Sequence, residues 1–199
     1  GTVTLASTIN SSNDAISFGA VTLGANTTID TNATGSGADL TIGAVTGGNN
    51  ALTLSTGDNI SGADVVATGD ISGVTTLTLA DVGGIANFNG AGVDVDVTTL
   101  IVGNTVAAVA FGNESSSVVN AVSFANDGIL LLGDAETVTF NGGVNTTSVG
   151  GTVTVQGTIL TSNDAVVFGN VSIGNSLIID TNATDGAGDI TIATVTSDD

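Results

Sequence analysis

The first 49 residues read GTVTLASTINSSNDAISFGAVTLGANTTIDTNATGSGADLTIGAVTGGN (residues 1–49). Short triplets within this stretch place Thr between two apolar residues, as in Val3-Thr4-Leu5, Val21-Thr22-Leu23 and Leu40-Thr41-Ile42. Neighbouring side chains of a β-strand point to opposite sides, so each triplet buries two apolar residues and exposes a hydroxyl. Segments rich in Gly, Asn and Asp separate the triplets and are turn signals. The stretch therefore predicts short, half-buried strands joined by turns.

The same stretch recurs at the end of the chain. Residues 151–199 read GTVTVQGTILTSNDAVVFGNVSIGNSLIIDTNATDGAGDITIATVTSDD and align with residues 1–49 without a gap, with 25 of 49 positions identical. Internal repetition is the sequence signature of stacked repeat architectures. We interpret residues 1–150 as one complete repeat unit and residues 151–199 as the start of a second copy, and we expect further copies beyond it.

Glycines recur at similar intervals along the unit. They are Gly19, Gly43, Gly62, Gly84, Gly103, Gly128, Gly150 and Gly169. If each marks one coil, seven coils of about 21 residues fill the 150-residue unit.

Two all-β architectures carry short strands of this kind. An immunoglobulin-type sandwich has antiparallel strands and a turn about every 8–12 residues. A solenoid stacks coils through parallel pairing, and parallel crossovers are right-handed. The absence of Pro and Trp, the very short strands and the uniform chemistry of every coil favour the solenoid. The predicted fold is an all-β parallel β-solenoid, a right-handed β-helix with about seven coils per 150-residue repeat.

The composition of the 199-residue chain excludes many functions. It has no Lys, Arg, His, Cys, Met, Trp, Tyr or Pro, while 17 Asp and 2 Glu give a formal net charge of −19. Nucleic-acid phosphates and anionic membrane surfaces require Lys or Arg, so we exclude both as partners. His-based triads, thiol nucleophiles, zinc sites and haem sites require His or Cys. The composition therefore predicts that the chain is not an enzyme.

The apolar residues predict a folded core but no membrane insertion. They make up 41% of the chain, which argues against disorder despite the net charge. No apolar run approaches the about 20 residues of a membrane-spanning helix. The six Phe residues are predicted to stack, for the most part, inside the coils.

One acidic loop is a candidate calcium site. The segment Asp30–Asp39 recurs as Asp180–Asp189, and its alternating oxygen side chains and glycines are of the kind that Ca²⁺ prefers. The alternative is a solvent-exposed turn in which Asp and Asn side chains bind their own backbone. The candidate metal ligands are Asp30, Asn32, Asp39, Asp180, Asn182, Asp185 and Asp189. We expect the fold to require no cofactor, with Ca²⁺ as the one candidate ligand.

Other acids are predicted to be structural. Asp14 and Asp164 each follow Ser-Asn and are expected to cap a turn. Asp94 and Asp96 alternate on one strand face, where paired carboxylates would suit polysaccharide cleavage, but a solvated face is the preferred interpretation. Since the acids do not recur at the predicted coil spacing, we expect them to be staggered around the perimeter.

The triplet pattern resembles a known class of surface proteins. Segments such as Gly19-Ala-Val-Thr-Leu-Gly24 and Asp39-Leu-Thr-Ile-Gly43, set between Asn- and Gly-rich turns, look like the repeats of filamentous-haemagglutinin-type exoproteins and autotransporter adhesin passengers. The resemblance implies a right-handed β-helix shaft at the bacterial cell surface or outside the cell, with a role in adhesion or in a surface fibre.

Three functions stay open from the sequence. The first is a rigid, non-catalytic shaft of an extracellular adhesin or filament. The second is a calcium-assisted surface-layer protein, and the third is a polysaccharide-processing β-helix enzyme. For the shaft, the expected partners are further copies of the chain stacked along the filament axis, because strand pattern runs to both ends, together with host or surface glycans.

Overall fold

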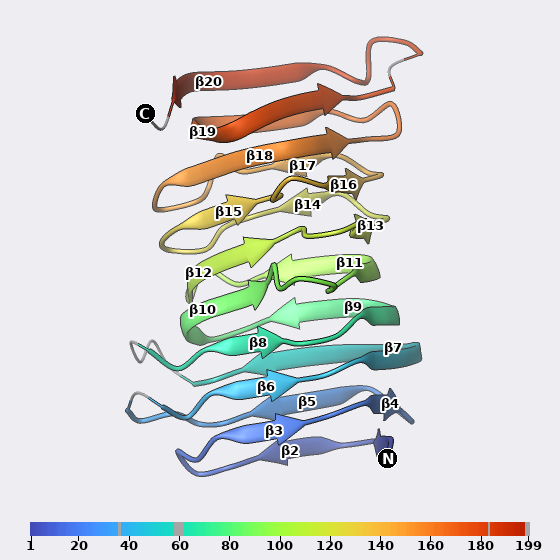
Figure 1. Ribbon diagram of the computed structural model, residues 1–199, viewed down its shortest axis with the longest axis vertical. Helices are drawn as coiled ribbons and strands as arrows, with labels where there is room; N and C mark the ends of the chain where they lie inside the picture. Colours follow the sequence, from blue (N-terminus) through green and yellow to red (C-terminus); the bar gives the residue numbers. More distant parts are fainter. Residues whose placement is uncertain (36, 58–61, 183, 198–199) are drawn as a thin grey trace.

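The computed structural model describes residues 1–35, 37–57, 62–182 and 184–197. These residues form a parallel β-solenoid of about 8 turns, and no helix occurs among them. In Figure 1 the chain crosses the front from left to right, returns behind from right to left, and rises from the N- to the C-terminal end. This winding is right-handed, so the predicted fold class is confirmed.

Three sheet faces enclose the core, and the chain visits them in the order front, right and back as seen in Figure 1. The strands confined to the front face are β3 (Ile16–Phe18), β6 (Leu40–Ile42), β8 (Val65–Ala67), β10 (Val82–Phe88), β12 (Val106–Phe111) and β15 (Leu130–Leu132). Those confined to the right face are β1 (Val3–Leu5), β4 (Val21–Leu23), β13 (Ser117–Val118) and β16 (Thr137–Phe140). Those confined to the back face are β2 (Thr8–Asn10), β5 (Thr27–Asp30), β14 (Val122–Ser123) and β17 (Val144–Asn145).

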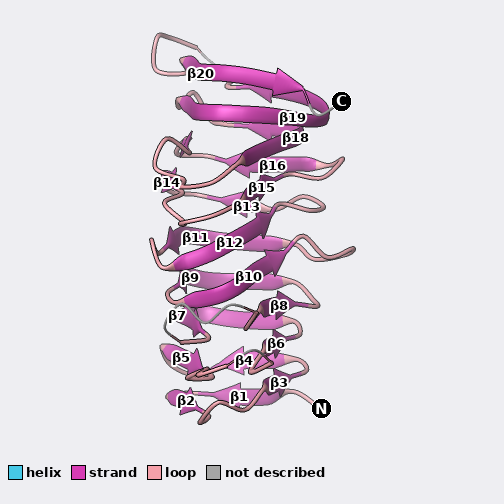
Figure 2. Cartoon of the chain, turned by 90° about the vertical axis from the view of Figure 1, so that its left-hand side faces the viewer, coloured by secondary structure: helices cyan, strands magenta, loops and turns pink. Residues whose placement is uncertain are grey.

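Longer strands bend around a corner and belong to more than one face. They are β7 (Val45–Ser55), β9 (Ile71–Leu79), β11 (Val95–Val102), β18 (Val153–Leu160), β19 (Val166–Asp180) and β20 (Ile190–Ser197). Figure 2, turned by 90°, shows the same strands stacked across the long axis, with loops projecting from the corners. Backbone hydrogen bonds between successive turns therefore run along the axis of the solenoid.

The front face shows the register of successive turns most completely. Each residue pairs with the next in the series Ile16, Leu40, Val65, Ala86, Val109, Leu130, Val153, Val171 and Val195. These positions are separated by eight turns of about 22 residues. At about 4.8 Å per turn, they span a rise of about 38 Å. The prediction of about seven coils per 150-residue repeat is confirmed.

The core is made of the inward side chains of all three faces. Phe111, Phe124 and Phe140 meet at its centre, with ring centroids 6.1 to 6.4 Å apart. Phe18, in contrast, is only half-buried near the N-terminal end. The Phe residues that are at most 1% exposed are Phe88, Phe111, Phe124, Phe140 and Phe168. The prediction that most Phe residues stack inside the coils is therefore confirmed.

The corner between the right and back faces depends on glycine. Gly48 and Gly73 have φ angles of 57° and 65°, in the region that side chains with a Cβ disfavour. A Cβ on Gly47 would collide with the carbonyl group of Gly73 in the next turn. Backbones of successive turns approach closely here, so the turns stay stacked while the chain changes direction.

Candidate functional site

The candidate calcium loop begins as a tight turn at the end of β5. The Asp30 carboxylate accepts the backbone N–H of Asn32 at 2.8 Å, and Asn32 adopts a φ of 44°. The Asn32 side-chain amide donates to the carbonyl of Ser11 in the preceding turn at 3.2 Å. The backbone N–H of Thr34 donates to Asn13 Oδ1 at 2.7 Å. These bonds form an Asx turn anchored to the coil below, the alternative interpretation of the sequence.

The second copy of the loop repeats this network. Asp180 accepts the backbone N–H of Asn182 at 2.9 Å, and the Asn182 amide donates to the carbonyl of Thr161 at 3.2 Å. The backbone N–H of Thr184 donates to Asn163 Oδ1 at 2.8 Å. Each distance agrees closely with its counterpart in the first copy, because nearly the same residues occupy the same local positions.

Asp185 is specific to the second copy. Its carboxylate accepts the backbone N–H of Ala187 at 2.9 Å and the side-chain amide of Asn163 at 3.1 Å. The bond from Ala187, followed by that from Asn163, lowers the pKa of the Asp185 carboxyl below its ordinary value. The first copy has Gly35 at this position, so the charge is not a property of the repeat itself.

Asp39 takes part in a different arrangement from Asp30. Its carboxylate accepts the backbone N–H of Asp64, one turn further on, at 2.9 Å. Asp64 in turn accepts the backbone N–H of Ile85 at 2.8 Å. The Asp39 carboxylate thus binds the backbone just before β8, and the Asp64 carboxylate binds the backbone within β10.

The right face has an equivalent column of acids. The backbone N–H of Asp94 donates to Asp70 at 3.1 Å, and the backbone N–H of Ser115 donates to Asp94 at 2.7 Å. The expectation that the acids are staggered is therefore wrong at these positions. The turns that separate Asp39 from Asp64 and Asp70 from Asp94 are longer than the predicted mean, so the acids come into line. Like charges in adjacent turns are accommodated because each carboxylate binds a backbone N–H group.

The seven candidate metal ligands do not converge on one point. Asp30 is on the back face, where it pairs in register with Ser55, while Asp180 is on the right face above Leu160. Among the residues that the structure describes, no three His, Cys, Asp or Glu side chains are grouped closely enough to hold a metal ion. Calcium binding by these loops stays a prediction.

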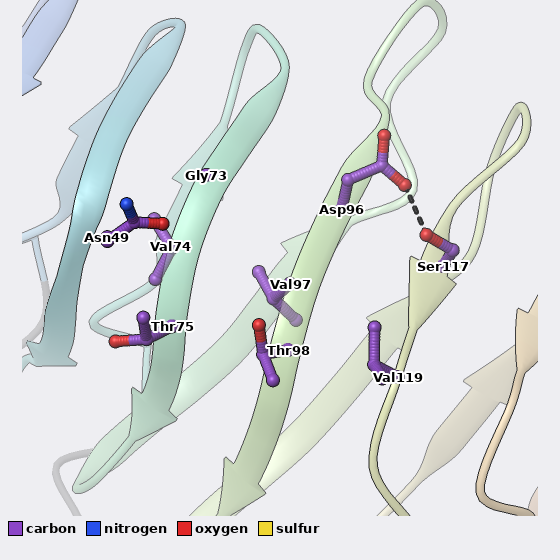
Figure 3. A pocket seen from close by; sticks show the side chains of 9 residues that line it. All are labelled: Asn49, Gly73, Val74, Thr75, Asp96, Val97, Thr98, Ser117 and Val119. Carbon is purple, nitrogen blue, oxygen red and sulfur yellow. Dashed lines mark hydrogen bonds between the residues drawn. The ribbon is translucent and has the colours of Figure 1, made fainter.

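Asp94 and Asp96 are the candidates for paired acid–base chemistry. Asp94 binds the backbone of Ser115, whereas the exposed Asp96 accepts a hydrogen bond from the Ser117 hydroxyl. Asp96, Ser117, Thr98 and Val119 are among the residues that line a hollow of about 190 Å³. Figure 3 shows these side chains and the hydrogen bond between Asp96 and Ser117. Each carboxylate therefore accepts a hydrogen bond from a residue of the next turn, which gives both acids a structural role.

The turns at Asp14 and Asp164 are held by a residue that the sequence interpretation missed. The hydroxyl of Ser11 donates to the backbone carbonyl of Asp14, and the hydroxyl of Thr161 donates to that of Asp164. The cap is therefore a Ser or Thr three residues before the Asp. The signal was available, because Ser or Thr occupies this position in both copies.

Comparison of the chain with protein-family models, curated proteins and solved structures found no match. No helix within the described ranges is long and apolar enough to cross a membrane. Function is therefore inferred from the architecture and from the surface chemistry of the solenoid.

Proposed function

We propose that the chain is part of the rigid, non-catalytic shaft of an extracellular cell-surface filament or adhesin. The observation that carries the proposal is the continuous parallel register over eight turns. Each turn pairs with its neighbours through hydrogen bonds along the axis, so bending the rod requires stretching several of them at once. A shaft needs this property, whereas a catalytic domain does not depend on it.

The outer surface supports the same role. On the right face, the outward positions are small hydroxyl residues over several consecutive turns, as in the series Thr4, Thr22, Thr46 and Ser72. The chain has 19 acids and no Lys, Arg or His, so parallel shafts repel one another. Lateral repulsion together with axial strand pairing favours growth along the axis, with further copies of the unit as the partners.

Location and adhesive role belong to this proposal as well. The resemblance to repeats of filamentous-haemagglutinin-type exoproteins supports a bacterial, cell-surface or extracellular location. Exposed Asn and Thr side chains offer hydrogen bonds to glycans, which are the proposed ligands of an adhesin built on this shaft.

Immunoelectron microscopy of the producing cells tests the proposal. Gold-labelled antibodies raised against the 199-residue chain should decorate thin, unbranched filaments that project from the cell surface. Labelling confined to the cytoplasm would overturn the proposal. A planar, EDTA-sensitive lattice would instead favour a calcium-assisted surface layer.

A further inference from the structure

The 150-residue sequence repeat does not correspond to a whole number of solenoid turns. Residues 1–49 correspond to residues 151–199, so Val153 is the counterpart of Val3. Val3 pairs with Val21 on the right face. Val153, however, pairs with Leu130 in the front-face series. Corresponding residues therefore occupy different faces.

The shift applies to all three faces. Thr4, on the right face, has its counterpart Thr154 on the front face, next to Leu131. Asp30 is on the back face, but its counterpart Asp180 is on the right face. Ile16, on the front face, has its counterpart Val166 on the back face. These face assignments make the second copy a rotated version of the first.

The strand pairings between successive turns give the size of this rotation. From Val3 the chain passes two faces to reach Ile16, and six complete turns then lead from Ile16 to Val153. One 150-residue unit therefore makes six and two-thirds turns rather than a whole seven. Figure 1 shows the consequence: the chain leaves β5 at the lower left corner, whereas it leaves β19, the corresponding strand end of the second copy, at the upper right.

We propose that tandem copies of the unit display their surface in three directions in succession, with each copy turned by one third of a turn. Successive loops project from the three corners in rotation, about 32 Å apart along the axis, and return to the same corner after about 96 Å. The shaft therefore presents the same interaction surface on every side. Side-by-side contacts between two shafts recur only at every third unit, which disfavours a planar layer.

The display of the surface in three directions by tandem copies rests on the proposed shaft function. The rotation between the two copies, however, can be tested in this chain alone. The chain contains no Cys, so any disulfide comes from the introduced residues. Leu131 and Thr154 are outward-facing neighbours in register, as are Thr139 and Leu160. Parallel strand neighbours about 4.8 Å apart meet the Cα spacing that a disulfide requires.

Three double variants distinguish six and two-thirds turns per unit from a whole number of turns. Leu131→Cys/Thr154→Cys and Thr139→Cys/Leu160→Cys should each lose both free thiols on mild oxidation and gain an intramolecular disulfide in the intact mass. Thr139→Cys/Thr154→Cys should keep both thiols, because these residues lie on different faces. With a whole number of turns per unit, residue 154 would instead occupy the right-face column that contains Thr139.

Selective cross-linking of Thr139→Cys/Thr154→Cys, with both thiols retained in the other two variants, would overturn the rotation. Circular dichroism of the reduced variants provides the folding control. The shaft function is judged separately, since cross-linking results do not depend on whether filaments are seen on cells. In such filaments, cryo-electron microscopy should find a screw of one third of a turn per unit.

Discussion

Removing the Phe111 ring should weaken the solenoid at its centre. The side chain is 0% exposed, and its ring centroid lies 6.4 Å from that of Phe124 and 6.1 Å from that of Phe140. Truncation of a buried Phe to Ala costs about 3–5 kcal/mol through lost burial and the remaining cavity. Because the ring also makes two aromatic contacts, the upper part of this range is expected. Phe111→Ala should therefore lower the free energy of unfolding by about 4–5 kcal/mol.

Thermal unfolding followed by far-ultraviolet circular dichroism measures this loss, since the chain has no Trp or Tyr for fluorescence. At about 2–4 °C per kcal/mol for a chain of this size, Tm should fall by about 8–20 °C. Ile129→Ala is the control, because Ile129 is 58% exposed and its truncation should change stability by less than about 0.5 kcal/mol. If Phe111→Ala does not fold, Phe111→Leu should give an intermediate loss. A folded Phe111→Ala protein that melts within about 2 °C of the parent would refute the assignment of this ring to the core.

Three further predictions concern the acids. Asp64→Asn should keep an acceptor for the Ile85 N–H and leave Tm nearly unchanged, whereas Asp64→Ala should lower the free energy of unfolding by about 1 kcal/mol. Equal melting temperatures of the two variants would contradict the backbone-binding role of Asp64. In an NMR titration of the folded chain, the pKa of Asp185 should lie below the ordinary carboxyl value of 3.8, and Asn163→Ala should raise it. A pKa of Asp185 that does not change in Asn163→Ala would count against the Asn163 contact. Because the folded-state pKa is lowered, Asp185 stabilises the fold above the unfolded-state value, and this contribution is lost as the pH falls through the folded-state pKa. The shaft should keep its β-type circular dichroism signal at room temperature in EDTA, with a Ca²⁺-supplemented sample as the control, and loss of the signal on chelation alone would favour the calcium-assisted surface layer.

The alignment of Asp39 with Asp64 in adjacent turns could not be predicted from the sequence. Asp39 and Asp64 lie next to each other in adjacent turns because their separation equals the length of the turn that brings Leu40 into register with Val65. Other turns differ: the one from Val153 to Val171 is much shorter. A prediction that assumes a uniform coil length therefore places the acids at the wrong positions around the perimeter. Turn length depends on how each corner packs, which a mean period does not contain.

The sequence by itself determined the strand and turn alternation, the internal repeat, the parallel solenoid and the burial of most Phe residues. These features follow from local patterns: an apolar–Thr–apolar triplet such as Leu40-Thr41-Ile42 has only one way to bury its apolar side chains in a strand. Only the tertiary structure decided which faces the two copies occupy and which acids lie in one column. Such relations depend on the accumulated length of all preceding turns, and a few residues gained or lost at one corner move every later residue around the axis.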